Sequence, residues 1–211
     1  TIRRQRQMCI RDSLKTLLNC EIGNLSPKEK IYLGYSKANI YHQNNEYKKS
    51  SYFLKIANEE KLKIQPSDIK RKLNTGEYYR NLRIDRNPSI ERITNNSRYL
   101  FIVGMPRCGS TLLESILSLN PEVQDLGEVC FLEESLQKTD DLIEVENLYA
   151  EKVKLINSEK KIFTDKNLFN FLYCPVIYNL FPNARIIHCT RNPLDNILSI
   201  YRTNFLNQSF S

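Results

Sequence analysis

The sequence lacks several features that whole classes of protein require. None of its apolar runs approaches the 18 or so residues of a transmembrane helix, and no apolar signal-peptide core follows the basic first residues. Six cysteines show no Cys-x-x-Cys spacing, and two histidines offer little metal chemistry. We therefore expect a cytoplasmic protein from a reducing compartment, with no structural metal and no membrane partner.

The net charge of +7 is unevenly distributed along a chain of 211 residues, which is long enough for one core of moderate size. Residues 1–13 hold four arginines and one aspartate, with no helical or strand period. This head resembles translated adapter sequence, and we interpret it as non-native or disordered. A basic arm for nucleic acid is the alternative, but no aromatic residues interleave the arginines, so we expect no nucleic-acid partner.

Residues 28–64 are charged, poor in glycine and proline, and spaced as a helix. A break at Gln43-Asn44-Asn45 predicts two helices joined by a turn. The apolar faces are formed by Ile31, Tyr35, Ala38 and Tyr41, then by Tyr47, Ser50, Phe53, Leu54 and Ala57. This pattern resembles one tetratricopeptide repeat, a unit of ~34 residues that must dock on a neighbour. An ordinary helical hairpin is an equal alternative.

A change of pattern at residue 97 predicts a second domain. We expect a helical, tetratricopeptide-like segment and linker over 14–96 and an α/β domain over 97–211, with Asn87-Pro88 and Asn95-Asn96-Ser97 marking the boundary. Short apolar runs at 99–103, 123–126, 161–164 and 185–190 alternate with helical segments. The alternation is typical of a parallel sheet flanked by helices.

Distinctive polar residues follow each predicted strand. They are 107–111, Glu128, Lys166 and Arg191, in chain order. Because ligands of open α/β sheets bind at the carboxyl ends of the strands, four independent segments direct polar groups to one edge.

The segment 104–109 has the layout of a phosphate-binding loop. It lies between an apolar strand and a helix that starts at Ser110, so backbone N–H groups and a helix N-terminus point at one place. Ser110 stands where the nucleotide-triphosphatase loop requires lysine, and Arg107 is the cation inside the loop. The loop therefore favours phosphate but disfavours ATP hydrolysis.

A second phosphate contact is predicted after the last strand. Asn192, Pro193 and Asp195 are typical of a helix start. The predicted buried face holds Leu194, Ile197, Leu198 and Tyr201. Ser199 falls about 140° from Leu194 at 100° per residue, so Arg191 and Ser199 can both clamp a phosphate. The alternative is a surface arginine and a solvated serine.

Together these segments resemble the sulfotransferases that use 3′-phosphoadenosine 5′-phosphosulfate. The similarity spans roughly 30–206 and is carried by four stretches, 101–114, 120–128, 164–171 and 180–205. They include Phe-Ile-Val-Gly-Met-Pro-Arg-Cys-Gly-Ser-Thr, Asp-Leu-Gly-Glu, Thr-Asp-Lys-Asn and Cys-Thr-Arg-Asn-Pro-Leu-Asp. The branch it resembles is bacterial, with N-terminal tetratricopeptide-like helices, and is similar to tyrosylprotein sulfotransferases.

The resemblance implies a role for each candidate site residue. The 5′-phosphosulfate would be held by Arg107, Cys108, Gly109, Ser110 and Thr111. Arg191 and Ser199 would hold the 3′-phosphate. Glu128 matches the general base, and Lys166 matches the cation that stabilises the leaving oxygen. Arg107 would help Lys166 to neutralise the negative charge that develops on that oxygen. No metal is required, because a sulfuryl group carries less charge than a phosphoryl group.

Two departures from the family pattern affect these expectations. The family usually carries serine where Cys108 stands, and this chain stops at Ser211, where family members continue with a loop over the nucleotide. We expect a C-terminally truncated fragment with impaired catalysis, and the composition suggests an AT-rich bacterial genome.

Two other functions stay open. They are an ATP-dependent, kinase-like phosphotransferase and a noncatalytic helical-repeat interaction module. The acceptor is open between protein tyrosine, a glycan hydroxyl and a small alcohol, as is the oligomeric state.

Overall fold

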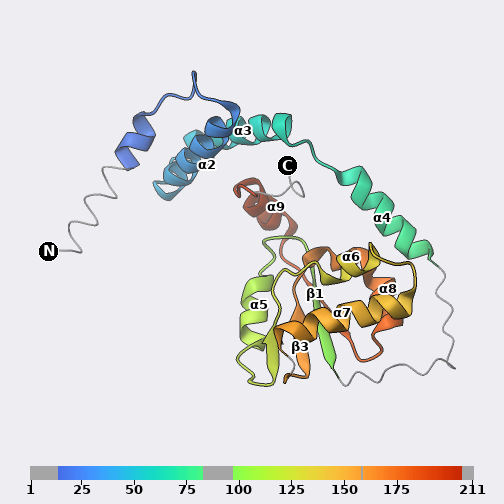
Figure 1. Cartoon of the computed structure of the whole chain (residues 1–211). Coiled ribbons are helices and arrows are strands. Elements are labelled where there is room, and N and C mark those ends of the chain that lie inside the picture. Colours follow the sequence, from blue (N-terminus) through green and yellow to red (C-terminus); the bar gives the residue numbers. More distant parts are fainter. Residues whose placement is uncertain (1–13, 83–96, 158, 206–211) are drawn as a thin grey trace. The chain divides into compact units, whose positions relative to one another are not determined.

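The computed structural model describes residues 14–82, 97–157 and 159–205 (Figure 1). The predicted head at 1–13 and the predicted boundary residues Asn87-Pro88 and Asn95-Asn96 lie outside the described residues. The chain divides into two compact units: Thr1–Ile69 with Ile197–Ser211, and Lys70–Asn196.

The helical unit is built around a hairpin of α2 (Pro27–Gln43) and α3 (Tyr47–Ile64), preceded by a helical stretch at 14–19. Ser26 and Glu29 cap the start of α2 reciprocally, and Pro27 takes its first position. One cluster of buried hydrophobic side chains joins the two helices, Ile31, Tyr35, Ala38, Leu54 and Ala57, whereas Tyr47 of the predicted second face is exposed. The two predicted helices and most of their predicted faces are therefore confirmed, while the tetratricopeptide resemblance stays a prediction.

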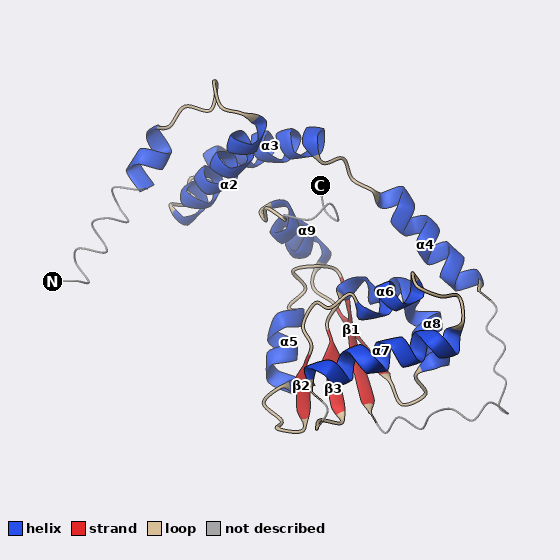
Figure 2. Ribbon diagram, viewed as in Figure 1, coloured by secondary structure: helices blue, strands red, loops and turns tan. Residues whose placement is uncertain are grey.

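The second unit contains a parallel sheet of four strands in the order β2-β3-β1-β4, of which β2, β3 and β1 are labelled in Figure 2. The strands are β1 (Arg98–Gly104), β2 (Val123–Asp125), β3 (Ile162–Asp165) and β4 (Arg185–Cys189). All three pairings are parallel, and each strand lies within one residue of its predicted bounds. The predicted mixed α/β architecture with a parallel sheet is confirmed.

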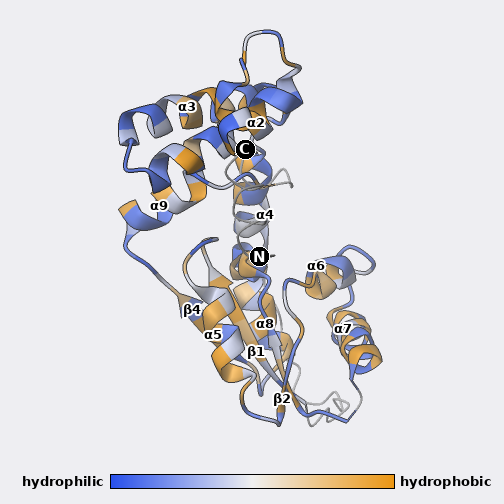
Figure 3. Ribbon diagram, turned by 90° about the vertical axis from the view of Figure 1, so that its left-hand side faces the viewer, coloured by the Kyte–Doolittle hydropathy of each residue, from blue (hydrophilic) through white to orange (hydrophobic). Residues whose placement is uncertain are grey.

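Helices connect these strands. They are α5 (Ser110–Leu117), α6 (Phe131–Leu136), α7 (Leu142–Ile156), the short 3₁₀ helix η1 (Leu168–Tyr173) and α8 (Cys174–Leu180). Helix α4 (Ile69–Asn81) precedes the sheet in sequence. Figure 3 shows many hydrophobic residues on the strands and on α7.

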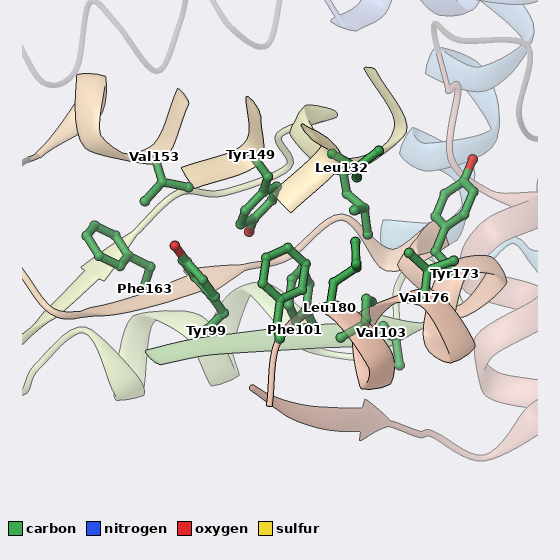
Figure 4. Packing of buried hydrophobic residues seen from close by; sticks show 13 residues of the cluster. Tyr99, Phe101, Val103, Leu132, Tyr149, Val153, Phe163, Tyr173, Val176 and Leu180 are labelled. Carbon is green, nitrogen blue, oxygen red and sulfur yellow. The ribbon is translucent and has the colours of Figure 1, made fainter. Parts of the chain in front are cut away.

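The residues of β1 alternate between two apolar layers, as a strand with a side-chain period of two requires. Tyr99, Phe101 and Val103 pack with residues of α6, α7 and α8 in the main core (Figure 4). Ile102 belongs to a smaller cluster with Cys108, against which Leu113 and Leu117 of α5 pack. Helix α5 is thus fixed on the sheet face opposite α7, directly after the predicted phosphate loop.

The prediction of a buried apolar face on α9 (Pro193–Tyr201) is wrong. Leu194 is 78% exposed and Ile197 is 62% exposed. Asn196 is the buried residue of this helix, and its amide donates to the carbonyl oxygen of Pro106 at 2.7 Å. The buried contact of α9 with the loop after β1 is therefore a hydrogen bond and not an apolar face. The predicted helix start is confirmed, because Asn192 Oδ1 accepts from the backbone N–H of Leu194 at 3.0 Å.

The compact units are drawn differently from the predicted domains. Helix α4 belongs almost entirely to the sheet unit, and α9 is divided between the two units after Asn196. The domain limits at 13/14 and 96/97 stay predictions.

Candidate functional site

The loop after β1 has a backbone that ordinary side chains rarely adopt. The φ angle is positive at Gly104, Arg107 and Gly109, with values of 151°, 67° and 103°. A Cβ at Gly104 would collide with the carbonyl oxygen of Cys189 on the neighbouring strand. Only glycine fits there, because β1 and β4 are paired at these two residues. The backbone conformation of this loop is therefore determined by its glycines and by the left-handed Arg107.

Helix α5 begins directly after this loop, with Gly109 as its N-cap and no capping side chain among the described contacts. The first N–H groups of a helix have no intrahelical partner and form its positive end. Ser110 is buried, whereas Arg107 and Thr111 are exposed. None of the described first-turn residues of α5 is acidic. These features suit an anion at the N-terminus of α5.

The carbonyl groups of the loop are bound from β4 and α9. Arg191 Nη1 donates to the carbonyl oxygen of Arg107 at 3.2 Å, next to the Pro106 carbonyl that Asn196 binds. The Cys189 thiol donates to the carbonyl of Cys108 at 3.6 Å. Burial, together with the neighbouring Cys108, raises the pKa of Cys189 to about 11. Arg191 therefore lies against the loop, which places two arginines at the end of β1 and β4.

Charged side chains meet at the ends of the other two strands. Lys166 follows β3, is buried, and donates from Nζ to Glu128 Oε1 at 2.8 Å. Its backbone N–H donates to the carbonyl of Gly127 at 2.9 Å, and Gly127 has a φ of 70°. This left-handed glycine places Glu128 beside Lys166. Two residues that the sequence predicted after separate strands are therefore in direct contact.

A buried carboxyl lies next to Lys166 in sequence. Asp165 accepts from the backbone N–H of Asn167 and from Asn170 Nδ2, both at 3.0 Å, and from the Tyr149 hydroxyl at 3.0 Å. Burial, with a smaller contribution from the charge of Glu114, raises the pKa of Asp165 from an ordinary value of 3.8 to about 7, although its three hydrogen bonds act in the opposite direction. Asp165 fixes the start of η1 behind the Lys166–Glu128 pair.

The structure thus brings the predicted residues together in two groups. The first group is a continuous loop and helix start, to which Arg191 is hydrogen-bonded, formed by Arg107, Cys108, Gly109, Ser110 and Thr111. Glu128 and Lys166 form the second group.

Ser199 belongs to the helical unit. It lies in the last part of α9, where its carbonyl accepts from the Thr203 hydroxyl at 2.7 Å. Its partnership with Arg191 stays a prediction.

Three polar residues of the site were not selected from the sequence. They are Glu114, Asp165 and Asn196, all buried. The available signal was a charged residue within an apolar segment: Glu114 interrupts an apolar helix, and Asp165 is the last residue of a buried strand. Their partners, however, lie on other segments of the chain.

Comparison with known proteins identifies the relationship that this geometry suggests. The model of the sulfotransferase family matches residues 100–147 and 132–211, which together span more than half of the chain. The chain belongs to the sulfotransferase family. The matched region includes the loop, Glu128, Lys166 and Arg191.

A relative among curated proteins is an uncharacterized protein of Aquifex aeolicus (strain VF5). It is 32% identical over 133 residues, which cover 52% of this chain and 18% of that protein. The chain therefore spans much less than two thirds of this relative. No solved structure matches the chain. Among the described residues, no helix is long and apolar enough to cross a membrane.

Proposed function

We propose that this sulfotransferase-family chain transfers a sulfuryl group from 3′-phosphoadenosine 5′-phosphosulfate to an acceptor hydroxyl. The observation that carries the proposal is the meeting of two groups at one sheet edge. A phosphate-type loop with arginines ends β1 and β4, and a lysine–glutamate pair ends β2 and β3.

Donor binding is assigned to the loop and its neighbours. The N–H groups at the start of α5, together with Arg107, Cys108, Gly109, Ser110 and Thr111, bind the 5′-phosphosulfate. The cysteine at 108 is compatible with this role, because its side chain is buried and the backbone amides bind the anion. Arg191, with Ser199, binds the 3′-phosphate, since a guanidinium matches phosphate geometry.

The reaction needs one proton removed and one leaving charge stabilised. The bound donor supplies a sulfuryl group attached to a phosphate oxygen, and transfer leaves adenosine 3′,5′-bisphosphate. Glu128 accepts the proton of the acceptor hydroxyl as the new S–O bond forms. Lys166 and Arg107 stabilise the negative charge on the phosphate oxygen that departs. No step assigned to these residues needs a metal.

The acceptor class and the helical segment are further parts of this proposal. A hydroxyl of a protein tyrosine, a glycan or a small alcohol satisfies the chemistry assigned to Glu128. We infer that α2 and α3 are a tetratricopeptide-like helix pair. A Cβ on Gly34 would lie 2.9 Å from Ala57 Cβ, which is a close crossing through small residues. Such a pair is suited to binding a protein acceptor.

A ligand comparison tests the proposal. The melting temperature is measured with adenosine 3′,5′-bisphosphate, with ATP and Mg²⁺, and with neither. We expect the bisphosphate to raise it most, and Arg107→Gln to abolish the rise. The matched control is Arg98→Gln, at the exposed opposite end of β1. A rise with ATP and Mg²⁺ alone would favour a kinase-like enzyme, and no rise at all a noncatalytic module. Transfer of labelled sulfate from the donor to a panel of hydroxyl acceptors then tests the reaction itself.

A further inference from the structure

Glu114 is a carboxylate enclosed within the sheet unit. It lies on α5, one turn after the loop, and its side chain is 8% exposed. Its Oε1 accepts from the Thr164 hydroxyl at 2.9 Å and from the Gly127 N–H at 3.3 Å. One carboxylate therefore links the helix of the phosphate loop to the ends of β2 and β3.

The second oxygen of Glu114 faces Lys166. Glu114 Oε2 lies 3.9 Å from Lys166 Nζ. The same Nζ atom contacts Glu128 Oε1 at 2.8 Å. The two carboxylates differ in their surroundings, because the Glu128 side chain is 70% exposed and that of Glu114 is 8% exposed. Lys166 thus lies between a buried carboxylate and one in contact with water.

This difference determines which contact opens more readily. An ion pair with an exposed partner contributes little, because water and salt replace it at low cost. A buried ammonium left without a counterion is costly, so the buried partner is retained. Glu128 can therefore turn away from Lys166, whereas Glu114 stays fixed by Thr164 and Gly127.

We propose that Glu114 is a positioning residue, holding Lys166 in place and balancing its charge while Glu128 is released to the acceptor hydroxyl. This inference rests on the proposed sulfuryl transfer. It resolves a conflict of roles, because a carboxylate that stays bonded to an ammonium binds a proton less readily. With Glu114 as the resident counterion, Glu128 serves as the base and Lys166 stays directed at the leaving oxygen.

The variant Glu114→Gln separates charge from shape. Its amide oxygen can still accept from Thr164 and Gly127, but the charge facing Lys166 is lost. We expect kcat for sulfate transfer to fall about 10-fold to 100-fold, as for a misplaced catalytic group. Affinity for adenosine 3′,5′-bisphosphate and the protection of the Gly127 amide against hydrogen exchange should be retained. Thr164→Val removes one hydrogen bond and keeps the charge, so its kcat should fall much less.

The outcomes distinguish this inference from the proposed function. No transfer by the unaltered protein would refute the function, and the inference with it. An active protein whose kcat survives Glu114→Gln would overturn the inference alone. Equal losses of kcat, nucleotide affinity and Gly127 protection would also overturn it, because they indicate a merely structural role. If Glu114→Gln does not fold, the test is the double variant with Lys166→Met: recovery of the fold supports charge balance, and failure to recover refutes it.

Discussion

The two halves of the candidate site are built by different physical means. The anion loop, residues 104–109 with the start of α5, owes its form to backbone conformation and to neighbours that bind its carbonyl groups. The charge cluster, Glu114, Glu128 and Lys166, owes its form to side chains that compensate one another. The loop half should therefore respond to changes of shape, and the charge cluster to changes of charge that leave shape intact.

The largest effect is expected in the charge cluster. Glu128→Gln keeps an oxygen for Lys166 but removes the proposed base, so turnover should fall by about 10²–10⁴. Affinity for adenosine 3′,5′-bisphosphate, measured by calorimetry, should stay nearly unchanged, since a base acts on the acceptor. The control is Glu122→Gln, at an exposed glutamate before β2. Retention of most of the activity in the Glu128→Gln variant would remove Glu128 from the mechanism.

A change of shape should produce the next largest effect, in the loop half. Gly104→Ala places a methyl group against the Cys189 carbonyl at a backbone angle that favours glycine. We expect the free energy of unfolding of the sheet unit to fall by about 3 kcal/mol, with loss of bisphosphate binding. Gly23→Ala is the control, because a Cβ there meets nothing within 4 Å. Equal stability of the two variants in urea would show that the loop tolerates the strain.

Arg191→Ala should have a smaller and more selective effect. Losing a charge-assisted contact with the 3′-phosphate should cost about 1.5–3 kcal/mol of binding free energy. Affinity for adenosine 5′-phosphate, which lacks that group, should change little. Arg185→Ala provides the comparison, since it removes an exposed arginine at the other end of β4. Equal losses for both nucleotides in calorimetry would assign Arg191 to the loop backbone alone.

The sequence predicted the elements better than the contacts between them. Short apolar runs that end in polar residues predicted all four strands to within one residue and placed Lys166 and Glu128 at one edge. The strand order and the role of Glu114 depend on which segments meet in space, which local periodicity does not encode. The periodicity of α9 predicted an apolar face but gave no information about what covers it, and Leu194 is exposed.

The last prediction concerns the pH dependence of stability at Asp165, the buried carboxyl next to the charge cluster. Because the pKa of Asp165 is raised to about 7 in the folded protein, the folded state holds a proton that the unfolded chain releases near its ordinary value of 3.8. This contribution is fully present below that value and is lost as the pH rises through about 7. The contribution of Asp165 to stability should therefore fall with rising pH across this window, by at most about 1.4 kcal/mol per pH unit.

Asp165→Asn isolates this contribution, because its amide oxygen can still accept from Asn167 and Asn170. Urea unfolding followed by circular dichroism should show a flatter pH dependence in Asp165→Asn, and an unchanged one in Asp125→Asn, at an exposed aspartate on β2. Residues 104–111 contain no carboxylate, so the loop half contributes no carboxylate titration to the pH dependence of stability. An identical pH slope in the unaltered protein and in Asp165→Asn would mean that Asp165 is ionised in the folded state. Burial would then be offset by its three hydrogen bonds, and the charge cluster would include a third carboxylate beside Lys166.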